Sequence, residues 1–409
     1  MEFYVVILAG GLSNRFWPLE EKNLFEFFGT PLIIYQIKRY SLFLKRAKIN
    51  PHFIVVTNER NHALISQQLQ KYNLNKPQLV TQTLPDQSGA VISALKKVTK
   101  DQPILIVNSN DIFSESLISD FLKKVDGKKL VLTATEVNSY FPGGYLEKDS
   151  QGKIQRIVEK PDPNTVPGQY NLFRFVLDFF PNRQLLEEVL DSHNNSLSYE
   201  DAINLILNKQ QSDLVINNQP FTSLKYPWHI LEAANIFLKT IKESVVKTQE
   251  LESSSQIVGK VFIAEGVKIG SFTKIVGPTY IGKNTLIGDH CLVRNSHIGA
   301  DCLIGAHSEV ARSYLGNKVM LHRNYVGDSV LSENTSFGAN TVTANWRFDE
   351  QIIKSVVESN KTETGFYKLG TITGSGVKVG VSTSLMPGVK IKKNTVVSPQ
   401  QTIYKDITK

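Results

Sequence analysis

A short stretch near the N-terminus combines glycines with two cations, and this combination can bind phosphate. An apolar run ending at Leu8 leads into Gly10 and Gly11, and Arg15 and Lys22 follow, seven residues apart. Glycines after a strand let backbone N–H groups approach a ligand closely. Arginine binds phosphate oxygens as a fork, and lysine binds them as a mobile point charge. These residues alone fit a polyphosphate-binding loop and an ordinary turn equally well.

The complete stretch is more specific than its parts. Residues 8–19 read LAGGLSNRFWPL, and this segment resembles the signature of sugar-1-phosphate nucleotidyltransferases, with RFWPL most similar to the mannose-1-phosphate guanylyltransferase version. The resemblance implies a Rossmann-like α/β domain that joins a nucleoside triphosphate to a sugar 1-phosphate and releases pyrophosphate. It implies nucleotide binding by Leu8, Gly10 and Gly11, and catalytic roles for Arg15 and Lys22.

The elements that must position these residues alternate between strand-like and helix-like segments. Short β-branched runs predict strands over 52–57, 78–83, 103–108 and 129–135. Amphipathic segments between them, such as 61–72 and 88–98, predict helices. This alternation favours a mostly parallel sheet covered by helices, in which ligands bind at the carboxyl ends of the strands.

Asp111 follows a predicted buried strand and therefore lies at such an end. Transfer of a nucleotidyl group needs charge neutralisation and positioning more than a strong base. We expect Asp111 to hold Mg²⁺ through a hard oxygen ligand, in preference to serving as a turn residue. The resemblance further implies that Gly144 approaches the sugar, that Glu159 accepts protons from its hydroxyl groups and that Asn171 reads it.

Three positions depart from the family pattern. Ser13 replaces a third glycine of the signature, where a serine is less free to adopt a positive φ. Ser223 falls where a second metal-binding acid is expected, and Phe173 replaces a small residue of the sugar-binding segment. These departures support an alternative in which the chain is a catalytically impaired regulatory homologue that binds a nucleotide sugar.

The second half of the chain has a different period. Aliphatic residues recur every six positions at Ile263, Ile269, Ile275, Ile281, Ile287 and Val293, then at Ile298, Ile304 and Val310, and later at Thr373, Val379, Leu385, Ile391 and Val397. This period predicts a hexapeptide β-helix in which each aliphatic side chain points inward and stacks on the next. Family resemblance adds that such helices are left-handed, parallel and commonly trimeric. Residues 346–368 lack the repeat and are expected to form an external loop.

His322 stands in this half at a position that the repeat does not require. The segments YVGD at 325–328, TAN at 343–345 and MPGV at 386–389 resemble the acetyltransferase domain of the bifunctional N-acetylglucosamine-1-phosphate uridyltransferase/glucosamine-1-phosphate acetyltransferase, above all its archaeal two-domain version. The resemblance implies acetyl-CoA as co-substrate and His322 as general base. It implies substrate binding by Arg294, Tyr325, Asn345 and Lys405. The alternative is a structural β-helix in which the histidine is idle.

The charge of the chain fits a protein that binds phosphate-bearing small molecules and an ordinary solvated basic face equally well. The 409 residues carry a net charge of +8, and 18 Lys and Arg against 11 Asp and Glu lie in residues 256–409. The basic residues are dispersed without aromatic interleaving, which argues against nucleic acid as a partner. No apolar run is long enough to span a membrane, and two cysteines are too few for a disulfide framework. We therefore expect a cytoplasmic protein, and a homotrimer by family resemblance.

These observations predict a nucleotidyltransferase domain over 1–245, a linker over 246–256 and a β-helix domain over 257–409. The expected function is synthesis of a nucleotide sugar, with UDP-N-acetylglucosamine as first choice, combined with acetylation of glucosamine 1-phosphate. The alternative enzyme is a mannose-1-phosphate guanylyltransferase, in which His322 would have no role.

Overall fold

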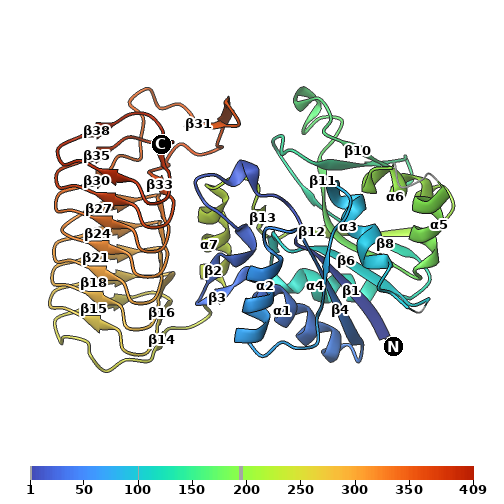
Figure 1. Ribbon diagram of the computed structural model, residues 1–409, viewed down its shortest axis with the longest axis horizontal. Coiled ribbons are helices and arrows are strands. Elements are labelled where there is room, and N and C mark those ends of the chain that lie inside the picture. The colour runs from blue at the N-terminus through green and yellow to red at the C-terminus, as the bar shows by residue number, and fades with distance from the viewer. Residues whose placement is uncertain (1, 100, 193–196) are drawn as a thin grey trace. The chain divides into compact units, whose positions relative to one another are not determined.

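The computed structural model describes residues 2–99, 101–192 and 197–409. Contacts divide the chain into two compact units. The first, which we call the sheet unit, comprises Met1–Leu12 and Pro31–Phe221. The second, which we call the β-helix unit, comprises Ser13–Thr30 and Thr222–Lys409. Figure 1 draws both units along the chain, and each is described separately.

The sheet unit is built on a sheet of nine strands in its described residues. Four parallel strands run from the middle of this sheet to one edge in the order β6-β1-β4-β5. The apolar runs of β1, β4 and β6 are buried, as expected for strands covered on both faces. Their bounds are β1 Glu2–Leu8, β4 Asn50–Thr57, β5 Gln78–Thr81 and β6 Ile104–Asn108. The other strands of the unit are β7 (Asp111–Phe113), β8 (Leu130–Glu136), β9 (Gly144–Lys148), β10 (Ile154–Glu159), β11 (Leu172–Phe180) and β12 (Ser212–Asn217).

The expectation of a mostly parallel sheet holds for only half of the pairings. Strand β11 pairs antiparallel with β6, β8 and β9, and β10 pairs antiparallel with β9. The turn at Asp149–Gly152 joins β9 and β10 as a hairpin, which accounts for the antiparallel pairing of these two strands. The parallel half lies where the sequence alternates between strands and helices.

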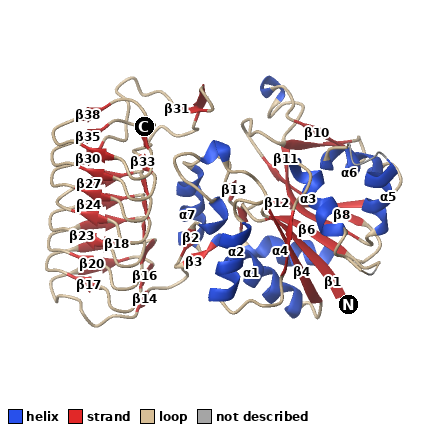
Figure 2. Ribbon diagram, in the orientation of Figure 1, coloured by secondary structure: helices blue, strands red, loops and turns tan. Residues whose placement is uncertain are grey.

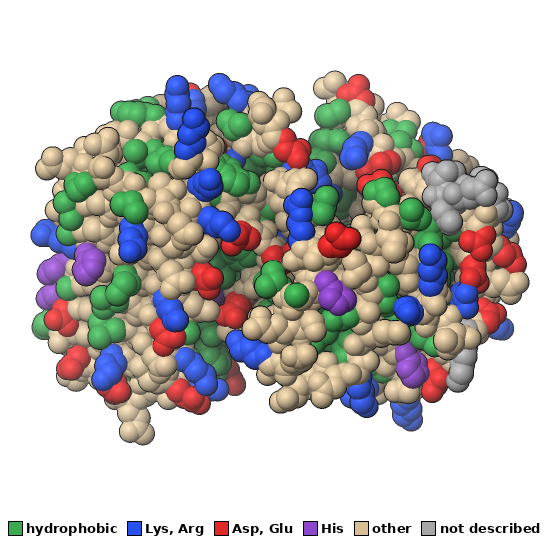
Figure 3. Space-filling view, in the orientation of Figure 1, with side chains coloured by type: hydrophobic (Ala, Val, Ile, Leu, Met, Phe, Trp, Pro, Cys, Tyr) green, Lys and Arg blue, Asp and Glu red, His purple; other side chains and the backbone are tan. Residues whose placement is uncertain are grey.

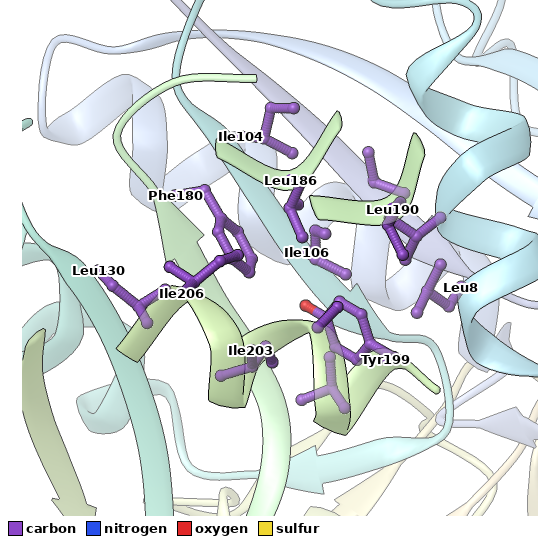
Figure 4. Packing of buried hydrophobic residues seen from close by; sticks show 14 of the residues in the cluster. Leu8, Ile104, Ile106, Leu130, Phe180, Leu186, Leu190, Tyr199, Ile203 and Ile206 are labelled. Carbon is purple, nitrogen blue, oxygen red and sulfur yellow. The ribbon is translucent and has the colours of Figure 1, made fainter. Parts of the chain in front are cut away.

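Helices cover this sheet, as Figure 2 shows. They are α1 (Leu32–Arg46), α2 (His62–Lys71), α3 (Asp86–Leu95), α4 (Glu115–Lys124), α5 (Gln184–Ser192) and α6 (Tyr199–Leu207), with a short 3₁₀ helix over Pro163–Thr165. Helices α5 and α6 pack their apolar faces on the central strands, where Leu190 and Ile203 meet Ile106 in one core (Figure 4). Ser198 caps helix α6, because its hydroxyl accepts a hydrogen bond from the Asp201 N–H, so the acidic residues of the first turn have a structural role.

The β-helix consists of short strands, and each strand pairs in parallel with the strand at the same position in the next coil. This pairing gives three parallel sheets in the described residues. Face 1 comprises β14 (Val245–Val246), β16 (Val261–Ile263), β19 (Thr279–Ile281), β22 (His297–Ile298), β25 (Tyr314–Leu315), β28 (Val330–Leu331), β33 (Ile372–Thr373) and β36 (Lys390–Ile391). Face 2 comprises β15 (Gln256–Val258), β18 (Lys274–Val276), β21 (Leu292–Arg294), β24 (Glu309–Ala311), β27 (Tyr325–Gly327), β30 (Val342–Thr343), β35 (Ser384–Leu385) and β38 (Thr402–Ile403). Face 3 comprises β17 (Lys268–Ile269), β20 (Leu286–Ile287), β23 (Leu303–Ile304), β26 (Met320–Leu321), β29 (Ser336–Phe337), β34 (Lys378–Val379) and β37 (Val396–Val397).

The six-residue period is explained by the inside of this helix. Ile281 lies opposite Ile298, and Ile287 opposite Ile304, in adjacent coils, and all four side chains are buried. The aliphatic residues of the repeat therefore form continuous internal columns. The architecture is that of a left-handed parallel β-helix of hexapeptide repeats, which confirms the expected fold class.

Two segments outside the regular repeat have defined structure. The expected linker 246–256 is part of the first coil, because β14 pairs with β16 and Leu251 bridges to Ile269. The segment 346–368 leaves the coils as expected, closed by a bridge between Trp346 and Lys368, and it contains the hairpin of β31 (Lys354–Val357) and β32 (Asn360–Glu363).

The division into units does not coincide with the expected domain 1–245. Aromatic rings join Ser13–Thr30 and the helix before the repeats to the β-helix: Phe27 stacks on Phe237 at 4.4 Å, and Phe28 on Tyr280 at 4.7 Å between ring centroids. The elements concerned are the 3₁₀ helices Asn14–Phe16 and Lys22–Leu24, β2 (Glu26–Phe27), β3 (Thr30–Pro31) and α7 (His229–Lys239), with β13 (Phe221–Ser223) at the boundary.

In the ranges that the structure describes, no helix combines the length and apolar character needed to cross a bilayer.

Candidate active sites

The glycine turn after β1 is held by two asparagines. Asn58 Nδ2 donates to the Gly10 carbonyl at 3.0 Å, and Asn61 Nδ2 donates to the Ala9 carbonyl at 2.8 Å. A Cβ atom at Gly10 would lie 2.1 Å from Gln82 Oε1, so a larger residue there would displace the Gln82 side chain. Leu8 is buried at the end of β1. Nothing in the sequence marked Asn58 and Asn61, because they become important only when their loop meets this turn.

Ser13 adopts the conformation that the missing glycine would have. Its φ of 57° and ψ of 20° lie in the left-handed region, so the expected restriction of the backbone at this position is wrong. A serine in this region costs of order 1 kcal/mol relative to glycine, which the surrounding structure must offset. The substitution therefore preserves the path of the loop.

Arg15 and Lys22 belong to the β-helix unit, whereas Gly10 and Gly11 belong to the sheet unit. Arg15 is exposed, and its guanidinium carbon lies 5.8 Å from the centroid of the Tyr226 ring. Lys22 is half-buried at the start of a 3₁₀ helix. The two cations thus belong to the same unit.

Asp111 is buried at the start of β7, with 2% of its surface exposed. Its Oδ2 accepts hydrogen bonds from the Val176 N–H at 3.2 Å and from Asn108 Nδ2 at 3.3 Å. Among the described residues, no group of three or more His, Cys, Asp or Glu side chains could hold a metal ion. A single carboxylate still fits Mg²⁺, since this ion is often bound by one or two carboxylates together with substrate phosphates.

Ser223, where a second acid was expected, is buried beside a histidine. Its backbone oxygen lies 2.7 Å from Nδ1 of His229, and the Lys225 N–H lies 3.3 Å from the same nitrogen. Burial lowers the pKa of His229 and keeps the imidazole neutral. This arrangement supplies no carboxylate to a metal.

Two of the three predicted sugar-binding residues lie together. Gly144 opens β9 opposite Glu159 at the end of β10, and a Cβ atom at Gly144 would lie 3.2 Å from Glu159 Oε2. Glu159 is also 3.7 Å from the Lys160 ammonium. Asn171 precedes β11 and is exposed, while Phe173 is buried against the rings of Phe141 and Tyr145. Phe173 is therefore part of an aromatic core.

Behind Gly144 lies a buried charge cluster that sequence reasoning missed. Arg174 forms an ion pair with Asp178 and another, at 3.4 Å, with Glu200. The hydroxyl of Tyr199 donates to Asp178 Oδ2 at 2.9 Å, and burial raises the pKa of Asp178 to about 6. The sequence did contain a signal for this cluster, because Arg174 and Asp178 carry opposite charges four residues apart inside the apolar strand β11.

A second set of predicted residues forms one polar network on face 2. Asn345 Nδ2 donates to Asp328 Oδ2 at 2.5 Å and to the Tyr325 hydroxyl at 3.2 Å. Arg312 donates to both oxygens of Asp328 at 2.6 Å, and these contacts raise the pKa of Arg312. Arg312 and Asp328 thus join the site, although neither was assigned a role from the sequence.

Gly327 makes this network possible. A Cβ atom there would lie 2.6 Å from the Tyr325 hydroxyl and 2.8 Å from Asn345 Nδ2. The two polar side chains therefore cross the backbone at this glycine. A larger residue would push them apart.

His322 is exposed on the turn between β26 and β27, directly before this network. The turn is held by buried Asn324, whose Oδ1 accepts from the His322 N–H at 2.5 Å and whose Nδ2 donates to the carbonyls of Gly338 and Thr341, each at 2.9 Å. The backbone of His322 is thus fixed while its ring reaches solvent. This is the arrangement that a base acting on an external substrate needs.

The other two predicted binding residues lie outside the network. Arg294 donates from Nε and Nη2 to Glu309 Oε1 at 3.1 and 2.6 Å, one coil earlier than Arg312 and Asp328. Lys405 is exposed after β38. Their proposed roles toward phosphate and CoA stay predictions.

Comparison with known proteins finds relatives of both the N-terminal and the C-terminal half of the chain. Residues 4–222 match the nucleotidyl transferase family model, and residues 260–295 match the model for the bacterial transferase hexapeptide (six repeats). The chain is 28% identical to the bifunctional protein GlmU of Methanococcus vannielii, over 99% of this chain and 95% of that protein. It is 29% identical to the bifunctional sugar-1-phosphate nucleotidylyltransferase/acetyltransferase of Sulfurisphaera tokodaii, over 98% of this chain and 97% of that protein.

The fold and these matches define a transferase that carries an α/β sheet followed by a hexapeptide β-helix. The chain belongs to the nucleotidyl transferase family, whose model covers more than half of its length.

Proposed function

We propose that the protein is a bifunctional enzyme that acetylates glucosamine 1-phosphate and converts a sugar 1-phosphate into a nucleotide sugar, with UDP-N-acetylglucosamine as the first choice. The observation that carries the proposal is the Tyr325–Asn345–Asp328 network beside His322, because a chain that only bound nucleotide sugars would not need it. The bifunctional relatives support the same assignment over nearly the full chain.

In the first reaction, an oxygen of the sugar phosphate attacks the α-phosphorus of the nucleoside triphosphate, and the bond to pyrophosphate breaks. Arg15 and Lys22 would bind the phosphate oxygens, and the turn at Gly10 and Gly11 would hold the nucleotide. Asp111 would hold Mg²⁺, which neutralises phosphate charge during the transfer. Gly144, Glu159 and Asn171 would bind the sugar.

In the second reaction, the sugar amine attacks the thioester carbon of acetyl-CoA, and the carbon–sulfur bond breaks to release CoA. His322 would take the proton from the attacking nitrogen. Tyr325 and Asn345 would orient the amine and the phosphate of the sugar. Arg294 and Lys405 would bind phosphate groups of the sugar and of CoA.

We further propose a homotrimer formed through the β-helix and a cytoplasmic location. Apolar side chains that point outward from face 3 support the trimer, since Leu286, Met320 and Val396 are 41%, 46% and 73% exposed. The two free, buried cysteines, Cys291 and Cys302, are in keeping with a reducing compartment.

The test is pyrophosphate release by the full chain with Mg²⁺, using UTP, GTP and dTTP in all combinations with the 1-phosphates of N-acetylglucosamine, glucose and mannose. UTP with N-acetylglucosamine 1-phosphate is expected to be the best pair. A preference for GTP with mannose 1-phosphate would support the guanylyltransferase alternative, which the RFWPL segment favours. The Asp111→Asn protein is the control and should lose at least about a hundredfold of activity. Nucleotide binding without turnover of any pair would indicate the regulatory homologue.

A further inference from the structure

The three outer faces of the β-helix differ in exposure. On face 3, outward side chains such as Met320 and Val396 reach solvent. On face 1, the outward positions are buried in coil after coil. These are Tyr280 (6% exposed), His297 (2%), Tyr314 (3%), Val330 (0%), Ile372 (0%) and Lys390 (1%). Part of face 1 is covered by residues of Ser13–Thr30, the segment that contains Arg15 and Lys22.

One end of this segment is held by an aromatic column on face 1. The rings of His297 and Tyr314 stack at 4.7 Å. The N–H of Phe28 donates to His297 Nε2 at 3.2 Å, and the Tyr314 hydroxyl donates to the Glu26 carbonyl at 2.8 Å. Asn317 Nδ2 donates to Glu26 Oε2 at 2.8 Å. Backbone and side-chain atoms of the segment are therefore both fixed here.

The other end is held several coils further along. The buried ammonium of Lys390 lies 5.0 Å from the centroid of the Trp17 ring, and Lys393 forms an ion pair with Glu20. The Pro18 carbonyl lies 2.9 Å from where a Cβ atom at Gly374 would be, so the segment touches the backbone of the coil. Residues 17–28 thus run lengthwise along face 1, from the coil of β36 to that of β19.

The segment has little regular structure with which to hold itself. It contains two 3₁₀ helices of three residues each and a two-residue strand. Fixing such a chain costs about 1–2 kcal/mol per residue in backbone entropy, and its short helices supply few hydrogen bonds to offset that cost. Arg15 lies two residues before Trp17, and Lys22 lies between Glu20 and Glu26. The contacts that Trp17, Glu20 and Glu26 make with face 1 therefore position both cations.

We propose that face 1 of the β-helix positions Arg15 and Lys22 for nucleotidyl transfer, with His297, Tyr314 and Lys393 as positioning residues. The second domain then contributes to the reaction of the first as well as to its own. This inference rests on the proposed phosphate-binding roles of Arg15 and Lys22. It predicts that damage to face 1 weakens the use of nucleoside triphosphate and leaves acetyl transfer unchanged.

The experiment uses full-length variants and compares three kinetic constants. His297→Ala should raise the KM for the nucleoside triphosphate about tenfold, and Tyr314→Phe and Lys393→Ala about threefold each, since each loses one anchor. The KM for the sugar 1-phosphate and the rate of acetyl transfer should change less than about twofold. His297→Gln keeps a hydrogen-bond acceptor for the Phe28 N–H and should recover part of the loss.

A matched control lies at another edge of the same β-helix. Figure 3 shows histidine side chains grouped there, and His290 stacks on His307 at 5.0 Å between ring centroids. His290 has a φ of 55°, which asparagine tolerates, so His290→Asn removes a stacked ring without touching the segment. This variant should keep wild-type kinetics in both reactions.

The outcomes separate this inference from the proposed function. An unchanged triphosphate KM in Tyr314→Phe and Lys393→Ala, which keep the fold, would overturn the inference while wild-type turnover upholds the function. A parallel fall of both activities in His297→Ala would also overturn it. A wild-type chain that neither binds triphosphate nor releases pyrophosphate would refute the nucleotidyltransferase function and this inference together.

Discussion

Faces 1 and 2 of the β-helix are built from the same six-residue repeat, yet their outward side chains meet different surroundings. On face 2, Tyr325 and Arg294 are partly exposed and belong to polar contacts that can receive a substrate. On face 1, His297 and Tyr314 are buried under another part of the chain. The comparison teaches that the inward positions specify the coil, which leaves each outer face available for a separate task.

The largest expected effect would separate the two faces by activity. His322→Asn removes the proposed base next to face 2, so acetyl transfer to glucosamine 1-phosphate should fall by about a hundred- to ten-thousandfold. Pyrophosphate release should stay within about twofold of wild type. CoA thiol release and pyrophosphate release, measured on one preparation, provide the check. Acetyl transfer at the wild-type rate would assign the histidine no catalytic role.

A smaller effect is expected from crowding the network on face 2. Gly327→Ala introduces a Cβ atom within 3 Å of two polar side-chain atoms, so kcat/KM for acetyl transfer should fall about tenfold. Gly168→Ala is the control, because its nearest contact would be an ordinary 3.6 Å. Equal kinetics for the two variants would mean that the network takes no part in binding the sugar.

Face 1 should be recognisable from the pH dependence of stability. Burial lowers the pKa of His297 to about 4 from its usual 6.5, so between these values the unfolded chain binds a proton that the folded chain does not. The free energy of unfolding should therefore fall as the pH is lowered from 6.5 to 4, by roughly 3 kcal/mol at most from this group. His297→Gln should flatten this dependence in urea titrations.

In the sheet unit, the buried Asp178 should change the free energy of unfolding with pH in the opposite direction to His297. Burial raises the pKa of Asp178 to about 6 from 3.8, so the folded chain takes up its proton first as the pH falls. Its contribution to stability therefore increases between pH 6 and 4, against that of His297. Asp178→Asn should steepen the acid destabilisation that His297→Gln relieves. Identical pH profiles for the two variants would contradict both assignments.

The smallest effect is expected at the exposed edge of the β-helix. His290→Asn should change the free energy of unfolding by no more than about 0.5 kcal/mol, because the ring is exposed and the left-handed backbone suits asparagine. Thermal unfolding of the two proteins side by side measures it. A much larger loss would mean that stacked rings stabilise this β-helix wherever they occur.

Much of the fold was predictable from local patterns. The six-residue period determined the β-helix, since each inward aliphatic side chain can be recognised without knowing its neighbours. The alternation of β-branched and amphipathic segments likewise predicted β4, β6, α2 and α3 to within a few residues. The direction of β11 was not predictable in this way, because it depends on the strands with which β11 pairs in the folded sheet.

The candidate sites likewise contain some residues that motifs indicated and others that only the tertiary structure revealed. Motifs by themselves indicated Gly10, Arg15, Asp111 and His322, because each follows a recognisable run of residues. Only the tertiary structure showed that Ser13 takes the conformation of the missing glycine and that Asn324 holds the turn of His322.

What the sequence determined by itself was therefore the repeat, the alternation and the chemical types of the candidate residues. What only the tertiary structure decided was the covering of part of face 1 by residues 17–28 and the pairing of Arg312 with Asp328. The physical reason is that an outward side chain in a β-helix has no partner within its own coil. Its surroundings depend on the adjacent coil, as for Arg312, or on segments hundreds of residues away, as for His297, and no local pattern records them.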